Sequence, residues 1–203
     1  EYGADIVVGD IQPLGIHMYG GGGLAGFIAS RDEPDIVAEY NAILISVAPG
    51  AKAGEVGFNY SSFERTSYDQ RGDSPDYIGT TQWLWGIVAG VYLSLMGPHG
   101  MREVGETIMQ SSAYAADQLA QLDGVRSPTF SGTFFKEFVV DFNKTGRSVE
   151  EINKNLLERG IFGGYNLAGD FPHLGQSALY CVTEVHDKAD IDELSDALRE
   201  VLG

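Results

Sequence analysis

The stretch GADIVVGDIQPLGIHMYGGGGLAGFIAS, residues 3–30, decides the fold of this chain. Asp5–Val8 is a short apolar run typical of a buried strand, although periodicity alone does not distinguish it from a buried helix. A polar loop follows, and four consecutive glycines, Gly20–Gly23, then lead into a second apolar run, Leu24–Ala29. Because glycine lacks a Cβ and tolerates positive φ, this order predicts a place where backbone approaches a ligand or another chain.

Composition limits the classes of protein to consider. A chain of 203 residues buries roughly 70% of its unfolded surface, which is enough for a core in one or two domains. The formal charge of −16 argues against nucleic acid as a partner, because phosphate binding needs basic surface. The single cysteine, Cys181, excludes an intrachain disulfide framework and agrees with a reducing compartment. With no signal-peptide pattern, we expect a cytoplasmic protein, and we interpret Cys181 as an inert core thiol.

The run Ile78–Met101 carries no formal charge, so a membrane span has to be considered. Its densest apolar part, Trp83–Met96, is interrupted by glycines and by Ser94. Since a spanning helix needs about 20 apolar residues, the run predicts a buried core helix and no membrane association. Thr80 and Thr81 are suited to cap this helix, and Gly97-Pro98 to end it.

The remaining pattern divides into two regions. Before the apolar helix, Ala42–Val47 reads as a strand closed by Pro49-Gly50, Glu55–Ser67 gives a weak hairpin signal, and Tyr68–Tyr77 reads as a polar loop. After it, Arg102–Leu122 predicts an amphipathic helix. Its expected inner face consists of residues at three- and four-residue spacings: Val104, Ile108, Ala115, Leu119 and Leu122.

The last seventy or so residues predict a strand, helix, strand, helix module. Phe134–Phe142 is rich in strand formers, and Ser148-Val-Glu-Glu151 is a capping box that opens a helix ending at Gly160. Ala178–Thr183 reads as a strand and Asp187–Leu202 as a helix with Ile191, Leu194, Leu198 and Val201 inward. We expect a small antiparallel sheet covered on one face.

Residues 3–30 resemble the pyridoxal-phosphate (PLP) region of the glycine cleavage system P-protein family, the decarboxylating glycine dehydrogenases. In the PLP-bearing subunit the stretch reads roughly D-V-x-x-x-N-x-H-K-T-F-x-x-P-H-G-G-G-G-P-G. Laid on Asp5 without gaps, its glycines fall on Gly20–Gly23, its histidine on Gln12 and its Schiff-base lysine on Pro13. The motif G-D-x-Q-P-L-G is typical of the other subunit, subunit 1, and Y-L-S-L-M-G-P and L-L-E-R-G-I match it further. The resemblance covers essentially the whole chain and corresponds to the C-terminal half of subunit 1.

The resemblance implies an α/β fold, the back half of an aspartate-aminotransferase-type PLP fold followed by a small α+β C-terminal domain. Residues 1–98 would be the C-terminal part of the large domain, and residues 99–203 the linking helix and the small domain. A halved domain leaves part of its core uncovered, so we expect a large exposed apolar face. We also expect the chain to be a fragment, because it lacks an initiator methionine and enters a strand within a few residues of Glu1.

The resemblance also implies a function: a lysine-less subunit, inactive alone, of the oxidoreductase glycine dehydrogenase (aminomethyl-transferring). A lysine-bearing P-protein subunit would hold PLP in a heteromer. The pair would decarboxylate glycine and pass the aminomethyl group to the lipoyl arm of the H-protein. The alternative is a non-catalytic structural or regulatory paralogue with the same fold; an independent enzyme would need a nucleophile and base pair that the sequence does not offer.

The candidate cofactor-binding residues are Gly79, Thr80, Thr81 and His17. A Gly-Thr pair at a helix start offers N–H groups and a hydroxyl to an anion, and by resemblance it would reach the partner's PLP phosphate. An ordinary helix cap and a structural histidine are the plainer interpretations. Asp10 and Gln12 either line a pocket or satisfy loop backbone.

Other chemistry has little support in the sequence. None of the lysines follows an apolar strand beside the glycines, so we expect no PLP linkage on this chain; they are Lys52, Lys136, Lys144, Lys154 and Lys188. The histidines form no ligand pair at helical spacing, so no metal site is expected. Arg65 and Arg71 are the cations nearest to the candidate anion site, and a solvated state suits both. No G-x-S-x-G motif suggests a serine nucleophile.

Overall fold

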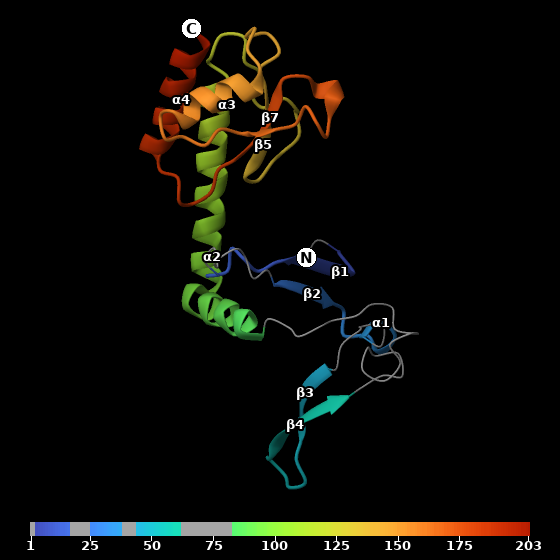
Figure 1. Cartoon of the computed structure of the whole chain (residues 1–203). Coiled ribbons are helices and arrows are strands. Elements are labelled where there is room, and N and C mark those ends of the chain that lie inside the picture. Colours follow the sequence, from blue (N-terminus) through green and yellow to red (C-terminus); the bar gives the residue numbers. More distant parts are fainter. Residues whose placement is uncertain (1–2, 17–24, 38–43, 62–82) are drawn as a thin grey trace. The chain divides into compact units, whose positions relative to one another are not determined.

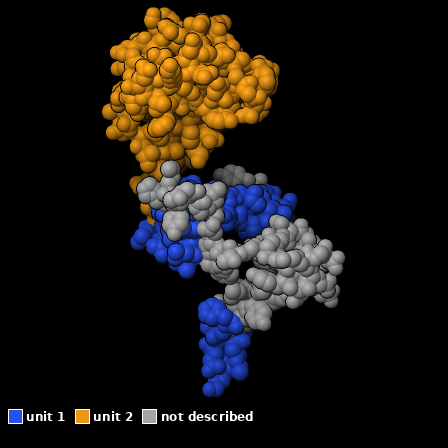
Figure 2. Space-filling view, viewed as in Figure 1, with its two compact units in different colours: residues 1–95 blue, residues 96–203 orange. Residues whose placement is uncertain are grey.

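The computed structural model describes residues 3–16, 25–37, 44–61 and 83–203 (Figure 1). The chain divides into two compact units, Glu1–Leu95 and Met96–Gly203, which Figure 2 shows in different colours. Each is described by itself below.

The opening stretch forms two paired strands. Strand β1 (Ile6–Asp10) pairs antiparallel with β2 (Gly26–Ser30), so that Ile6 lies opposite Ser30 and Asp10 opposite Gly26. The strands predicted around Asp5–Val8 and Leu24–Ala29 therefore exist. The expectation that the first is buried is wrong for this chain, because every residue of β1 is exposed. Its apolar side chains find no cover among the described residues.

A second pair of strands follows the short helix α1 (Pro34–Val37). Strand β3 (Leu44–Pro49) pairs antiparallel with β4 (Val56–Ser61). The turn between them is closed by the amide N–H of Gly50, which donates to the carbonyl of Glu55 at 2.7 Å. The strand closed by Pro49-Gly50 is confirmed. Of the weak hairpin signal over Glu55–Ser67, the described part is the single strand β4, which forms a hairpin with β3, and residues 62–67 lie outside the described residues.

The apolar helix is the first part of α2 (Trp83–Leu119). It was expected to be a buried core helix, and this is wrong for this chain: Ala89 is buried, whereas Leu84, Ile87 and Leu95 are exposed. Apolar composition shows that a helix needs cover but does not show which polypeptide supplies it. Among the described residues, no helix is long and apolar enough to cross a membrane.

Helix α2 contains a kink at Gly97, which has φ 61° and ψ −178°. This conformation is essentially restricted to glycine, and Pro98 removes the next backbone donor. The predicted break at Gly97-Pro98 is therefore confirmed, although helical structure resumes at once and continues to Leu119. In the second part, Ile108, Ala115 and Leu119 are buried, as the amphipathic pattern predicted.

The second unit contains a three-stranded antiparallel sheet in the order β5-β7-β6. Its elements are β5 (Glu137–Asp141), α3 (Val149–Leu157), β6 (Tyr165–Asn166), a 3-10 turn (Pro172–Leu174), β7 (Ser177–Cys181) and α4 (Lys188–Leu202). The predicted capping box is present: Ser148 Oγ accepts from the Glu151 amide at 3.2 Å, and the Glu151 carboxylate accepts from the Ser148 amide at 3.0 Å. Strand β6 was not predicted.

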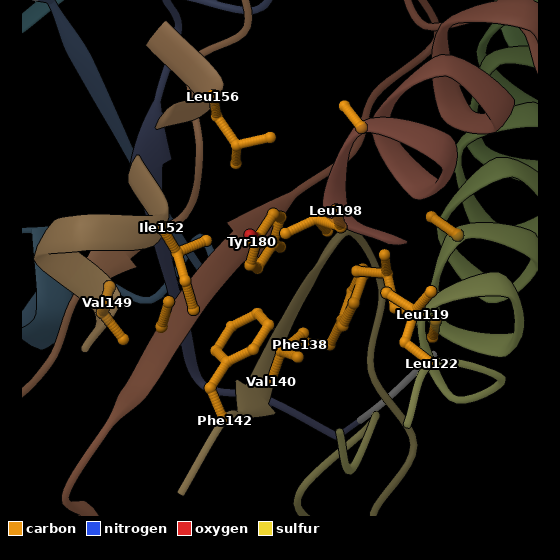
Figure 3. Close-up of a cluster of buried hydrophobic side chains, with 14 of the residues drawn as sticks. Leu119, Leu122, Phe138, Val140, Phe142, Val149, Ile152, Leu156, Tyr180 and Leu198 are labelled. Carbon is orange, nitrogen blue, oxygen red and sulfur yellow. The ribbon is translucent and has the colours of Figure 1, made fainter. Parts of the chain in front are cut away.

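One face of this sheet packs against helices to form the core (Figure 3). The helices contribute the fully buried residues Leu119 of α2, Ile152 and Leu156 of α3, and Leu198 of α4, and Phe142, which directly follows β5, is also fully buried. The sheet covered on one face is therefore as predicted.

Cys181 is not a core thiol, contrary to the sequence interpretation, because its residue is exposed. Successive side chains of a strand alternate between faces. Tyr180 and Val182 take the buried face, which leaves Cys181 on the other. Desolvation, the largest cause, and the nearby Glu137 carboxylate raise the pKa of the Cys181 thiol, so the thiolate that reacts as a nucleophile is disfavoured.

Candidate functional site

The loop that follows β1 is held in shape by its own side chains. The Asp10 carboxylate accepts from the Gln12 amide at 2.5 Å, and Gln12 Nε2 donates to the carbonyl of Ile16 at 2.8 Å. The amide of Leu14 closes a turn on the carbonyl of Ile11 at 2.9 Å. Asp10 and Gln12 were expected either to line a pocket or to satisfy loop backbone. The structure shows both residues bonded to loop backbone, and Asp10 also lines a small pocket.

The loop is anchored on the first part of α2. Ile11 and Ile16 are buried with Ala89 in a small apolar cluster. Gly15 has φ 81°, and a Cβ at this position would lie 3.1 Å from the Cβ of Tyr92. Glycine is therefore needed for the backbone conformation and for the close approach to the helix.

Pro13 lies on the exposed side of this loop. By the resemblance, this is the position of the Schiff-base lysine in the PLP-bearing subunit. A small pocket of about 290 Å³ lies at the adjacent end of the two strands, lined by Gly9, Asp10, Ala25 and Gly26. Asp10 supplies the one ionisable side chain of that lining, and it is an acid. The described part of the loop thus offers neither an amine to bind PLP covalently nor a cation for its phosphate.

None of the five lysines has the setting of a Schiff-base lysine, which is desolvated or beside another cation. Lys52 is exposed in the β3–β4 turn, 3.9 Å from Glu55. Lys136, Lys144, Lys154 and Lys188 belong to the second unit, and none is buried. A hydrogen bond to the Asp192 carboxylate raises the pKa of Lys188, which is opposite to the change that activates a nucleophilic amine.

The four predicted cofactor-binding residues, His17, Gly79, Thr80 and Thr81, lie outside the described residues. The same holds for Gly20–Gly23 and for Arg65 and Arg71. Asp10, Gln12 and Pro13 are the residues of the predicted site that the structure brings together. Within the described ranges, no group of three or more histidine, cysteine, aspartate or glutamate residues could hold a metal ion.

A larger pocket, of about 750 Å³, lies in the second unit and was missed by sequence reasoning. Its lining consists of residues 159–165, of residues 179–182 at the end of β7, and of residues 185, 186, 190, 191, 193 and 194. The adjacent glycines Gly163 and Gly164 were the available signal, because a pair of glycines between apolar residues often marks a close approach of backbone.

Comparison with solved structures defines the class of fold. The chain superposes on glycine decarboxylase (P-protein) of the glycine cleavage system, in inhibitor-bound form, with TM-score 0.84 and 31% identity, covering 98% of this chain and 44% of that one. At 15% identity and TM-score 0.61, it also resembles a sphingosine-1-phosphate lyase of Burkholderia pseudomallei over 99% of this chain and 38% of that one. A C-DES mutant with glycine covalently linked to its PLP cofactor superposes with TM-score 0.54 at 18% identity, over 87% of this chain and 42% of that one. The fold is therefore the mixed α/β fold of PLP-dependent enzymes.

The sequence comparison is more specific. Residues 1–198 match the family described as glycine cleavage system P-protein. The chain is 36% identical, over its whole length, to the probable glycine dehydrogenase (decarboxylating) subunit 1 of Pyrococcus furiosus and 35% identical to that of Methylococcus capsulatus. The chain therefore belongs to the glycine cleavage system P-protein family, as its sequence motifs predicted. It spans 44% and 43% of the length of these two relatives.

Proposed function

We propose that this chain is the lysine-free half of a two-subunit, PLP-dependent glycine dehydrogenase (aminomethyl-transferring), and that it completes a site whose cofactor is held by a lysine-bearing partner subunit. The observation that carries the proposal is the exposed Pro13 at the position where the resemblance puts the Schiff-base lysine. The family match and the relatives named subunit 1 support a heteromer of this kind. The transfer of the aminomethyl group to the lipoyl arm of the H-protein is part of the proposal.

The role of this chain is to orient and to shield. When bound, PLP acts as an electron sink for bonds at the α-carbon of glycine. In the proposed assembly, Thr80, Thr81 and Gly79 donate hydrogen bonds to its phosphate, and His17 donates to the same anion. The loop from Asp10 to Ile16 forms one wall. A wall with a fixed backbone keeps water from the reacting atoms without reorganising during the reaction.

A borohydride trap tests where PLP is held. The chain is mixed with PLP, alone and together with a lysine-bearing P-protein subunit, reduced, digested and searched by mass spectrometry for pyridoxyl-lysine. We expect a specific modification on the partner subunit alone and co-elution of the two chains. One specifically modified lysine on this chain in the absence of a partner would overturn the proposal.

Substitution of Thr80 tests the contact with the cofactor. In the assembled enzyme, Thr80→Ala should weaken PLP binding about tenfold or more, since it removes a hydrogen bond to a charged phosphate. The control is Ser94→Ala, because Ser94 is an exposed helix residue whose hydroxyl donates to the Gly90 carbonyl at 2.7 Å. Equal PLP affinity and rate for Thr80→Ala and the control would favour the non-catalytic paralogue.

A further inference from the structure

The central strand of the second unit has an unused backbone edge at Cys181. In an antiparallel sheet, the N–H and C=O of one residue point to the same neighbour, and those of the next residue point to the other side. The Val182 amide donates to the Lys136 carbonyl at 2.9 Å, on the side of β5. The Leu167 amide donates to the Ser177 carbonyl at 3.0 Å, on the side of β6. By this alternation, the N–H and C=O of Cys181 point to the side of β6.

Strand β6 does not reach Cys181. It pairs with β7 through Tyr165↔Leu179 and Asn166↔Ala178, and the same register would put Gly163 opposite Cys181. Instead, the chain before Tyr165 leaves the sheet. In the part of the chain that the structure describes, no hydrogen bond satisfies the backbone of Cys181 on this side.

Two glycines hold the departing segment away from the edge. The Gly164 carbonyl accepts from Asn153 Nδ2 of α3 at 2.8 Å. A Cβ at Gly164 would lie 2.6 Å from Cε2 of Tyr180, and one at Gly163 would lie 2.1 Å from Oδ1 of Asn153. The segment is therefore packed against α3 and the inner face of the sheet. The gap that it leaves beside β7 belongs to the pocket of about 750 Å³.

The walls of this groove are apolar and open to solvent. Phe162 is 88% exposed and Val185 is 75% exposed, although both are large apolar side chains. Tyr165 is also exposed, while Ile161 and Leu194 are partly buried against the core below. An edge of backbone donors and acceptors beside apolar side-chain positions is the arrangement that binds an extended peptide as an added strand.

The charges at the rim are acidic. Asp190 and Glu193 line the groove, and Glu193 has no ion pair within the described ranges. The basic side chains of the lining are Arg159 and His186. Arg159 lies 3.5 Å from Glu200 and donates to the Asn155 carbonyl, and His186 Nδ1 accepts from the Thr183 amide at 3.1 Å. A second copy of this chain, with its formal charge of −16, suits this rim poorly, whereas an extended segment with basic residues suits it well.

We propose that the groove beside Cys181 is a docking site for an extended, basic segment of a partner protein, which adds to the sheet next to β7. Main-chain hydrogen bonds to Cys181 set its register. An apolar side chain of the segment lies among Phe162, Val185 and Leu194, and its basic residues face Asp190 and Glu193.

The probe is a fluorescein-labelled synthetic peptide of alternating valine and lysine, and binding to the 203-residue chain is measured by anisotropy. We expect a Kd tighter than about 1 mM. Replacing the lysines by glutamates, or methylating the backbone nitrogens that face β7, should weaken binding about tenfold or more. Because Cys181 is the single cysteine, the peptide should also slow the reaction of its thiol with an aromatic disulfide reagent.

The variant Val185→Asp should weaken peptide binding about tenfold or more, since it places a charge on the apolar wall. Leu157→Asp is the matched control, because Leu157 is exposed on α3 and outside the groove lining. The affinity of this variant for the peptide should stay within about twofold of the wild-type value. Circular dichroism checks that both variants remain folded. Lack of peptide binding to the wild-type chain, or equal binding by both variants, would overturn the proposal, as would equal affinity for the N-methylated peptide.

Discussion

At the scale of single residues, Gly164 determines where the chain leaves the sheet of the second unit. Its place is defined by two close neighbours: an added Cβ would lie 2.6 Å from Cε2 of Tyr180 and 2.9 Å from the Cβ of Ala178. Both neighbours are buried in the core. Neither can move away without disturbing other contacts, because protein interiors are close-packed.

We therefore expect Gly164→Ala to lower the free energy of unfolding by about 2 kcal/mol, the usual cost of overpacking a core. The control is Gly169→Ala, where a Cβ would meet no heavy atom within 4 Å. Urea unfolding followed by circular dichroism measures both. Equal stability of the two variants would show that the backbone at Gly164 has room to shift.

Cys181 shows why burial is harder to predict than secondary structure. The run Ala178–Thr183 was predicted as a strand because of its residue types, and β7 confirms it. However, Ala178, Leu179 and Tyr180 are consecutive and apolar, so the alternation that would separate the inner from the outer face is missing. The register with β5 decides the matter by placing Tyr180 inward.

At the scale of elements, one polar cluster joins α4 to α2. The hydroxyl of Tyr114 on α2 donates to Asp192 Oδ1 on α4 at 2.5 Å. Lys188 forms an ion pair with the same carboxylate, and its ammonium lies 5.1 Å from the centre of the Tyr114 ring. The hydrogen bond from Lys188, and then that from Tyr114, lower the pKa of Asp192.

Tyr114→Phe should lower the free energy of unfolding slightly at neutral pH, because it removes a hydrogen bond to a carboxylate that is open to solvent. The pKa of Asp192 is lower in the folded state. The stabilisation is therefore complete above the ordinary aspartate pKa and is lost as the pH falls through the folded value. The difference between wild type and variant should shrink on acidification. Denaturant unfolding measured from neutral to acidic pH tests this; a constant difference would contradict the assignment to Asp192.

Helices were predicted better than short strands. The capping box at Ser148 and the apolar stripe of Ile108, Ala115 and Leu119 are local patterns, and both appear in α3 and α2. Strand β6 has two residues, Tyr165 and Asn166. It exists because β7 lies beside it, and no local pattern of this length can indicate such a partner.

At the scale of the whole molecule, the two units differ in how well they cover their apolar residues. The resemblance predicted a large exposed apolar face. In the first unit, apolar side chains of the paired strands β1 and β2 and of the helix are exposed, among them Ile6, Val8, Ile28, Ile87 and Leu95. The strands and the helix could be predicted because their apolar runs are local patterns. Periodicity could not predict that their apolar side chains would be exposed. That expectation came from the resemblance, and the chain spans 44% of the length of the Pyrococcus furiosus relative.

The difference between the units should appear in native-state hydrogen exchange. The second unit has one cluster that joins α2, the strands β5 and β7, and the helices α3 and α4, whereas the buried cluster described in the first unit consists of Ile11, Ile16 and Ala89. Backbone opening is easier where few apolar contacts are lost. We therefore expect amides of β1, β2 and the first part of α2 to exchange at least about tenfold faster than those of β5 and β7. Exchange followed by mass spectrometry on the isolated chain measures this.

Adding the lysine-bearing P-protein subunit should slow exchange in the first unit if that subunit covers the exposed apolar side chains. Uniform protection of both units in the isolated chain would show that the first unit is stable without further cover.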